Sequence, residues 1–474
     1  MAGTFSSFNT ALSAIRYNNT VLQNASNNIS NASTEGYVRR RVLGGEIGGP
    51  DQPAMYARYD GHGEGVRVTD VQRQVDALLD ARLRREVSQQ SYLDTQAAVL
   101  GRVETGIGEP GDNGVAAALA AFKKSWEDLA NDPGVDAPRQ QVLARASILA
   151  DTLAAQSRNI SGEEADQRVK TLGIVSEINI AARDLAELNE KIHVTELNGI
   201  DNNALRDTRD QLALRLSELT GGATTVRADG MFDVSVNGTS LVSGGQAGTF
   251  EVTAGINPDG TATGAPIAFG INDGTTTTAV PVAGLRGELG ATHDMLATTL
   301  PGHRLALNAL AADFASTINA LHVGTATNDA YDRNGNPGGA FFSVVAGDEA
   351  ATLQVLITDP DEIAASGIAS VGGNLDGGNA HRIFDEAFGA ASGEYQRMVN
   401  SFGTNVAAVE RKAANQAAMT AQVSNSWEAQ AGVNLDEETV TMVTAQRAFE
   451  AAGKLMTVLD SVLDTLINRT GVTR

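Results

Sequence analysis

The sequence predicts a mainly α fold with inserted β structure, in which the N- and C-terminal helices pair as a coiled coil. Apolar residues recur every three or four positions through most of the chain, as on one face of a helix. Narrow stripes of the same spacing lie at both ends of the chain. Residues 221–280 differ, because they hold 12 Gly, 11 Thr and one basic residue. Together these patterns indicate a long helical-bundle body and a nested Gly/Thr-rich β domain.

Near the N-terminus, apolar residues follow a 4-3-4-3 spacing that two polar positions, Asn19 and Ser26, complete. The apolar members are Phe8, Leu12, Ile15, Leu22 and Ile29. Near the C-terminus the spacing runs without a break through Met442, Ala445, Phe449, Ala452, Met456, Leu459, Leu463 and Leu466. Two apolar positions in seven are typical of a coiled-coil seam rather than of a broader globular face. Two ordinary surface helices remain an alternative interpretation.

The middle of the chain alternates between helical and β patterns. Residues 66–220 have helical spacing, with turn residues at 108–111 and 131–134. Alternation over 232–236, followed by Asn237-Gly238 and a second apolar run, predicts a β-hairpin with a type I′ turn. A disordered linker is the alternative for this region. Helical spacing returns at 285–322 and at 383–428, and 351–357 is a short strand candidate.

These patterns divide the chain into four units, two of which are discontinuous. The units are a terminal coiled coil of 1–45 with 430–474, a helical body of 46–220 with 286–325 and 383–429, an inserted β domain of 221–285, and a loop-rich insertion of 326–382. An insertion of this kind leaves the two halves of the helical body paired in space.

Composition excludes several classes of function. The chain has 474 residues and a formal charge of −22, which disfavours binding to nucleic acid or to anionic lipid. It has no cysteine, and no run of 18 apolar residues predicts membrane insertion. The N-terminus lacks a basic start followed by an apolar block, so we expect no cleaved signal peptide.

The sequence offers no candidate catalytic, cofactor-binding or metal site. No two of the six histidines have the i, i+4 spacing of a helical metal pair. Asp332-Arg-Asn334-Gly-Asn336 imitates the start of a calcium loop, but the position that requires Gly is Pro337. We interpret it as a tight polar turn, and the chain as an assembly component rather than an enzyme.

Both ends carry motifs that resemble a known family. Residues 26–40 read SNNISNASTEGYVRR, and the C-terminal region holds GVNLDEE at 432–438, AQRAFEA at 445–451 and LDSVLDTL at 459–466. These motifs, in this order, resemble the axial proteins of the bacterial flagellum, which include rod, hook and hook-associated proteins. Internal segments such as SWEDLANDP at 125–133 and LRDTRDQL at 205–212 are most similar to the proteins of the hook–filament junction.

The resemblance implies a structural, extracellular role at the hook–filament junction of the flagellum. It implies export without a cleaved signal through the flagellar type III export apparatus, with an export chaperone, and self-assembly into a ring through the terminal helices. The implied partners are further copies of the chain, the hook protein and the second hook-associated junction protein. The alternatives are another axial protein, such as the hook protein or the second junction protein, or a secreted adhesin or enzyme that uses the β insert. The expected subunit-interface residues are Phe8, Leu12, Ile15, Leu22, Asn27, Asn28, Ile29, Asn31, Met442, Phe449, Met456, Leu459, Leu463 and Leu466.

Overall fold

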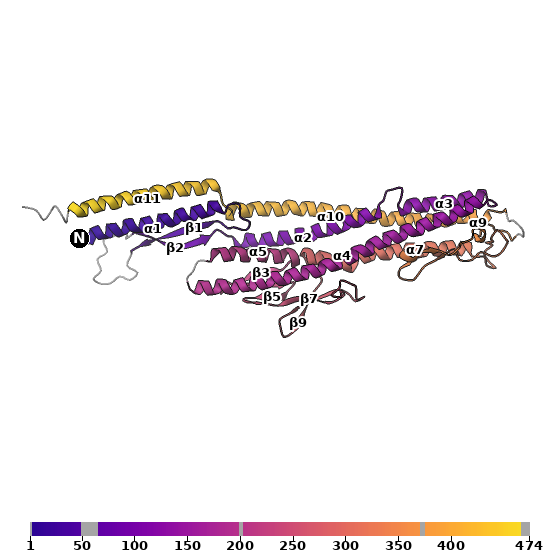
Figure 1. Cartoon of the computed structure of the whole chain (residues 1–474), viewed down its shortest axis with the longest axis horizontal. Coiled ribbons are helices and arrows are strands. Elements are labelled where there is room, and N and C mark those ends of the chain that lie inside the picture. The colour runs from indigo at the N-terminus through magenta and orange to yellow at the C-terminus, as the bar shows by residue number, and fades with distance from the viewer. Residues whose placement is uncertain (1, 49–64, 199–201, 370–374, 466–474) are drawn as a thin grey trace, which may run out of the picture.

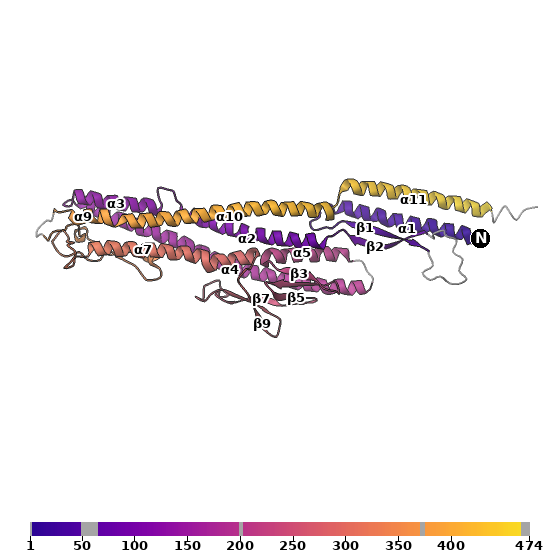
Figure 2. The same cartoon turned by 180° about the vertical axis from the view of Figure 1, so that it is seen from behind.

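The molecule is an elongated helical structure with a slender two-helix end (Figures 1 and 2). The computed structural model describes residues 2–48, 65–198, 202–369 and 375–465. The fold is mainly helical with inserted antiparallel sheets, which confirms the predicted fold class. Among the described residues, no helix combines the length and the apolar character needed to cross a bilayer.

The slender end, which we term the terminal rod, combines both ends of the described chain. It consists of α1 (Ala2–Ser30), β1 (Arg40–Ile47), β2 (Gly65–Arg73) and α11 (Leu435–Asp464). Helices α1 and α11 lie side by side, and the antiparallel β1–β2 hairpin packs on α1. The Asn434 side chain caps α11 by accepting hydrogen bonds from the Asp436 and Glu437 amides, which fixes where the helix begins.

The body is a bundle of long helices that run nearly along the axis of the molecule (Figure 1). Its helices are α2 (Ala77–Ile107), α3 (Val115–Asn131), α4 (Asp136–Leu197), α5 (Asn203–Thr220), α6 (Gly287–Asp294), a π-helical turn (Met295–Thr299), α7 (Leu300–His322), α9 (Gly378–Glu386) and α10 (Phe388–Ala431). With 62 residues, α4 is about 93 Å long at 1.5 Å per residue. It contributes to both hydrophobic clusters of the body and so connects them.

The distal cluster, far from the terminal rod, is rich in aromatic side chains. Phe122 and Trp126 of α3 are fully buried and contact Phe314, Phe341 and Phe388 at ring-centroid distances of 5.4–6.2 Å. Such pairs stabilise a core beyond the effect of the buried area alone. This packing holds α3, α7 and α10 together.

The loop-rich segment over this cluster contains short elements only. They are β10 (Phe342–Ser343), α8 (Glu349–Thr352), β11 (Gln354–Val355) and a 3-10 turn (Pro360–Glu362). His322, fully buried, contacts the Gly339 carbonyl through Nδ1 (2.8 Å) and accepts a hydrogen bond from the Ala364 amide at Nε2 (2.8 Å). Burial lowers the pKa of His322 to about 4, so this imidazole is neutral at pH 7.

The proximal cluster joins α4 and α5 to the inserted sheets. A four-stranded sheet has the order β3 (Ala223–Val226), β4 (Phe232–Val236), β5 (Thr239–Ser243) and β6 (Gln246–Ala247), and a three-stranded sheet has the order β7 (Thr249–Ala254), β8 (Ala268–Asn272) and β9 (Thr277–Val280). Asn237 and Gly238 both have positive φ between β4 and β5, as the predicted type I′ turn requires. The buried Asn189 amide of α4 donates to the Phe232 and Gly244 carbonyls and holds the sheet on the helix.

Two expectations for the middle of the chain need correction. The residues from 66 onward, whose spacing predicted a helix, form strand β2 as far as Arg73, and α2 begins only at Ala77. The apolar spacing at the start of this region does not mark a buried helix face, because Leu78 in the first turn of α2 is 83% exposed. The candidate strand 351–357 is also mostly absent: its first residues end helix α8, and only Gln354–Val355 pair with β10.

The boundary expected after residue 45 falls inside β1, whereas the whole β1–β2 hairpin packs on α1. The hairpin therefore lies with the terminal rod, and the body begins near α2. The sheets β3 to β9 lie between residues 223 and 280, inside the segment expected as an insertion. At the predicted polar turn, Asp332 Oδ1 accepts hydrogen bonds from the Asn334 and Asn336 amides.

Candidate assembly site

Helices α1 and α11 contact each other along lines of small residues. Ala11 and Ala25 are the buried apolar residues of α1, and Ala445 and Ala452 are those of α11. The spacings of 14 and 7 residues are multiples of the heptad repeat, so each pair faces the same side of its helix. Alanines at these positions allow the two backbones to approach closely.

On α11 the predicted stripe lies along this contact. Met442, Met456, Leu459 and Leu463 are half-buried beside the two buried alanines, whereas Phe449 is 39% exposed at the edge of the contact. Leu466 lies outside the described residues.

On α1 the predicted stripe is displaced from the contact line. Its apolar members Phe8, Leu12, Ile15, Leu22 and Ile29 are only half-buried, and the polar members Asn19 and Ser26 are exposed. The buried positions Ala11, Ala25 and Asn28 each precede a predicted position by one residue, so the most buried line of α1 is rotated by about 100° from the predicted stripe. The bulky residues lie beside this line and are partly covered.

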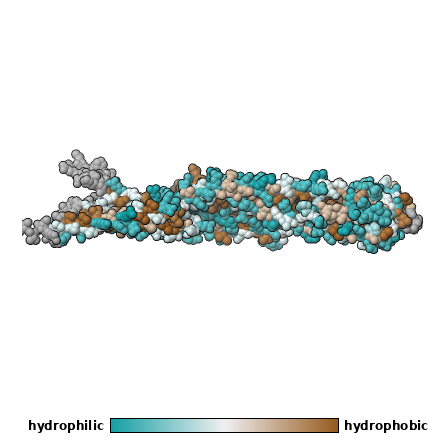
Figure 3. Space-filling view, turned by 90° about the horizontal axis from the view of Figure 1, so that it is seen from above, coloured by the Kyte–Doolittle hydropathy of each residue, from teal (hydrophilic) through white to brown (hydrophobic). Residues whose placement is uncertain are grey.

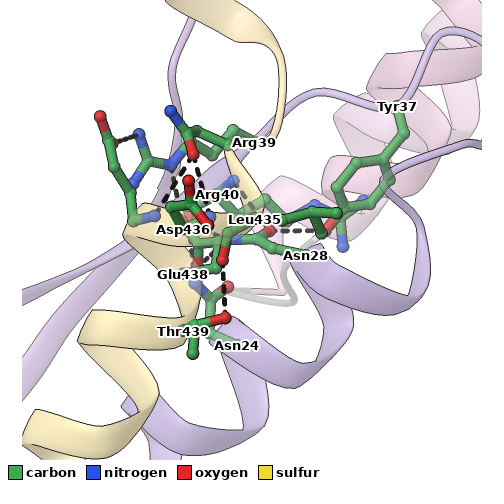
Figure 4. Close-up of polar contacts among 11 residues, drawn as sticks. Asn24, Asn28, Tyr37, Arg39, Arg40, Leu435, Asp436, Glu438 and Thr439 are labelled. Carbon is green, nitrogen blue, oxygen red and sulfur yellow. Dashed lines mark hydrogen bonds and ion pairs between the residues drawn. The ribbon is translucent and has the colours of Figure 1, made fainter.

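A buried polar cluster closes the helix pair at the end nearest the body (Figure 4). We term it the polar clasp; it comprises Asn28, Tyr37, Arg39, Arg40 and Glu438. The Asn28 amide donates to Glu438 Oε2 (3.0 Å) and to the Arg40 carbonyl (2.9 Å). Its oxygen accepts hydrogen bonds from the Tyr37 hydroxyl (2.8 Å) and the Arg40 amide. The Arg39 side chain donates to Glu438 Oε1 (2.7 Å).

The buried carboxylate of the polar clasp, Glu438, forms an ion pair with Arg39. Glu438 is 3% exposed, and the Arg39 guanidinium contacts both this carboxylate and that of Glu437 (2.7 Å). Burial alone would lower the pKa of Arg39, but hydrogen bonds to both glutamates raise it above its ordinary value. Burial raises the pKa of Tyr37, so its hydroxyl stays protonated and can donate to Asn28. A single buried Asn in a helix seam fixes the register of the two helices.

The other two predicted asparagines have local contacts. Asn27 is exposed, and its carbonyl accepts hydrogen bonds from the backbone and side-chain amides of Asn31 at the end of α1. The Asn31 oxygen accepts a hydrogen bond from Thr34 (3.3 Å). These two residues shape the turn after α1, whereas Asn28 reaches α11.

The terminal rod meets the body at a joint of paired charges. Arg40 and Arg73 are directly opposite each other in the β1–β2 hairpin, and both contact Asp207 of α5 (3.0 and 2.7 Å). Arg73 also contacts Asp210 (2.6 Å), and Asn203 donates to the Val71 carbonyl (2.8 Å). Burial raises the pKa of Asp207, although Arg73 and Arg40 act in the opposite direction.

No apolar cluster crosses this joint within the described residues, since neither hydrophobic cluster includes a member of the terminal rod. Hydrogen bonds and ion pairs from Arg40, Arg73 and Asn203 thus connect the rod to the body. Sequence reasoning missed the joint, although it singled out residues 205–212, which supply Asp207 and Asp210. The available signal was four charged residues, Arg206, Asp207, Arg209 and Asp210, on one helical segment that carries an amphipathic stripe.

The joint also contains a cavity of about 1020 Å³. Its walls come from the turn after α1, the first turns of α2, α5 and the end of α10, including Trp427, whose Nε1 donates to Asp80 (2.6 Å). In Figure 3 hydrophobic residues gather along the terminal rod and where it joins the body. Among the described residues, no group of three or more His, Asp or Glu side chains is arranged to hold a metal ion.

Two family models match this chain. Residues 100–342, just over half of its length, match the model described as flagellar hook-associated protein FlgK helical domain. Residues 428–469 match the model described as flagellar basal body rod FlgEFG protein C-terminal. The second match covers α11, and the first covers most of the body with its inserted sheets.

Relatives and a solved structure are similar over most of the chain. Flagellar hook-associated protein 1 of Bacillus subtilis is 25% identical, covering 100% of this chain and 99% of the relative. The protein of that name in Escherichia coli K12 is 22% identical, covering 97% and 99%. The flagellar hook junction protein FlgK from Burkholderia pseudomallei has a similar fold, with a TM-score of 0.63 at 16% identity, covering 73% of this chain and 99% of that structure.

Proposed function

The chain belongs to the flagellar hook-associated protein FlgK family, and on that basis we propose that its terminal rod joins copies of the chain into the junction between hook and filament. It is a structural component of the flagellum. The name hook-associated protein 1, shared by the relatives, favours this role over that of the hook protein or of the second junction protein. The proposal assigns no catalytic step to the chain.

The observation that carries the proposal is a second apolar stripe on α11, which lies to one side of the helix face marked by buried Ala445 and Ala452. We term it the outer stripe; it comprises Ala451, Leu455, Val458 and Val462, all exposed. Their 4-3-4 spacing is that of a coiled-coil seam. Leu455 is three residues from buried Ala452 and so lies about 60° around the helix from it, while Val458 lies about 120° away on the same side. A helix with seams on two sides can bind α1 of its own chain and a helix of a second copy.

The remaining partners follow from the same role. We propose contacts with the hook protein on one side of the ring and with the second hook-associated protein on the other. We also propose that the chain leaves the cell through the flagellar type III export apparatus, with an export chaperone, and acts outside the cell. The separation of the rod from the hydrophobic clusters of the body supports export, because neither part needs the other's core to refold.

The test is electron microscopy of cells from which the gene is deleted, carrying the chain on a plasmid. We expect hooks without filaments in the deletion strain and filaments after complementation. Leu455→Asp with Val458→Asp places charge on the outer stripe and should abolish filaments, whereas Thr457→Asp, an exposed position on the same helix, should not. Normal filaments in the deletion strain would contradict the proposed function, and filaments from the double variant would contradict the role of the outer stripe.

A further inference from the structure

The joint cavity is acidic and only partly enclosed by its own chain. Its walls carry six carboxylates: Glu35, Asp80, Asp207, Asp210, Glu428 and Glu437. Two arginines, Arg39 and Arg84, also line it, which leaves four more negative than positive side chains. Apolar side chains such as Trp427 and Leu214 complete the walls. A cationic group with an apolar neighbour fits this chemistry.

Two buried carboxylate oxygens beside the cavity, Asp207 Oδ1 and Asp210 Oδ1, accept no hydrogen bond from the described residues, although Asp207 Oδ1 has an ion pair with Arg73. Asp210 Oδ1 is buried and accepts no hydrogen bond from the described residues, and its nearest recorded cation, the Arg84 Nη2, is 3.9 Å away. The Asp210 carboxylate is therefore held through its other oxygen by Arg73 (2.6 Å), and it adds to the negative charge beside the cavity.

The opposite face of α2 carries a matching group. Leu78, Arg82 and Arg85 have i, i+4, i+7 spacing and lie on one face of the helix. Leu78 is 83% exposed and Arg85 is exposed. The Arg82 side chain is 55% exposed, with only a long contact of 4.0 Å to Glu86. We term these three residues the basic knob.

Knob and cavity lie back to back on the same turns of α2. Asp80, Leu83 and Arg84 line the cavity, while Leu78 and Arg82 are each two residues from Asp80 and therefore lie about 200° around the helix. The two features thus face opposite directions at one height along the molecule. A contact between different surfaces of identical subunits generates a ring when its rotation closes.

We infer that the basic knob of one copy docks into the joint cavity of the next copy, as the lateral contact of the ring. This inference rests on the proposed function. The arginines of the knob pair with the exposed carboxylates at the rim, Glu35 and Glu428. Leu78 packs against the apolar wall, which explains why a leucine is exposed on an otherwise polar face. The contact also stabilises the joint, because the neighbouring copy contacts both the terminal rod and the body.

Disulfide cross-linking tests this contact, since the chain has no native cysteine. Two copies, one tagged and carrying Leu78→Cys and one carrying Val433→Cys in the cavity, are expressed together in deletion cells that build filaments. Oxidation should give a disulfide-linked pair of tagged and untagged chains. Replacing Val433→Cys by Ser316→Cys, an exposed position in α7, is the control. No cross-link with Val433→Cys, or an equal yield with Ser316→Cys, would overturn the inference.

A charge exchange gives a second, independent measurement. Arg85→Glu or Glu428→Arg alone should reduce the number of filaments at least tenfold, and the two together should restore it, because like charges are replaced by an opposite pair. Arg145→Glu and Glu410→Arg are matched exposed controls and should have no effect. If the unmodified chain fails to restore filaments, the proposed function fails. If it restores them but the single reversals have no effect, or the pair does not rescue, only the lateral contact is refuted.

Discussion

Replacing Arg39 by alanine tests how far the terminal rod depends on the polar clasp. The change leaves Glu438, which is 3% exposed, with Asn28 as its remaining side-chain donor among the described residues. Removing one partner of a buried ion pair costs about 3–5 kcal/mol, because the other charge stays buried without compensation. Arg39 itself is 25% exposed, so water can partly replace it and we expect the lower value, about 3 kcal/mol.

The matched control is Glu437→Gln. Glu437 also pairs with Arg39 at 2.7 Å, but its side chain is 58% exposed. Exposed ion pairs contribute about 0–1 kcal/mol, so this variant should be nearly neutral. Arg39 pairs with both Glu437 and Glu438. Comparing the two variants therefore compares the loss of both ion pairs with the loss of the exposed pair alone.

The assay is amide hydrogen exchange of the full-length chain, followed in peptides from α1 and α11. Since 1.4 kcal/mol corresponds to a factor of ten, Arg39→Ala should accelerate exchange in both helices by roughly a hundredfold, and Glu437→Gln by about fivefold at most. Exchange in α3 should not change. If both variants had the same small effect, the clasp would not stabilise the helix pair, and the reasoning would be refuted.

Three further predictions address the seam and the body. Leu459→Asp puts a charge into the α1–α11 contact and should abolish filaments without altering the thermal unfolding of the body, and intact filaments would contradict this; Thr457→Asp is the exposed control. The pKa of His322 is about 4 in the folded chain against an ordinary value of 6.5, so the unfolded state binds more protons between these values. The free energy of unfolding of the body should therefore fall by up to about 3 kcal/mol as the pH falls from 6.5 to 4, measured by urea denaturation; His322→Gln should lose this contribution while His381→Gln keeps it. Asn189→Ala removes the amide between α4 and β4 and should destabilise the inserted sheets by about 1–3 kcal/mol, visible as faster exchange in β4 but not in α3.

Features encoded by local periodicity could be predicted from the sequence. Asn237-Gly238 specified its hairpin because the turn needs two residues with positive φ, and the seam of α11 followed from an unbroken heptad spacing. On α1 the most buried positions, Ala11, Ala25 and Asn28, each precede a predicted position by one residue, and the predicted subunit-interface residues stay a prediction. Helical spacing alone likewise could not distinguish β2 from the start of a helix.

The joint could not be predicted, because its contacts join residues far apart in the sequence. Arg40 and Asp207 are separated by 167 positions, and neither has a neighbour pattern that specifies its partner. Asn28 was expected at an interface, but its partner was not predicted, because Glu438 is 410 positions away in the sequence. Pairings of single charged or polar side chains carry no periodicity, so only the folded topology reveals them.

Helix α4 has a mechanical consequence for the body of the molecule. It passes through both hydrophobic clusters as one uninterrupted helix, so the body has no point along α4 at which its two halves could pivot independently. Close-packed interiors transmit strain. Strain at one end of the body is therefore transmitted along α4 to its other end, whereas the terminal rod is connected to the body by paired charges and belongs to neither hydrophobic cluster.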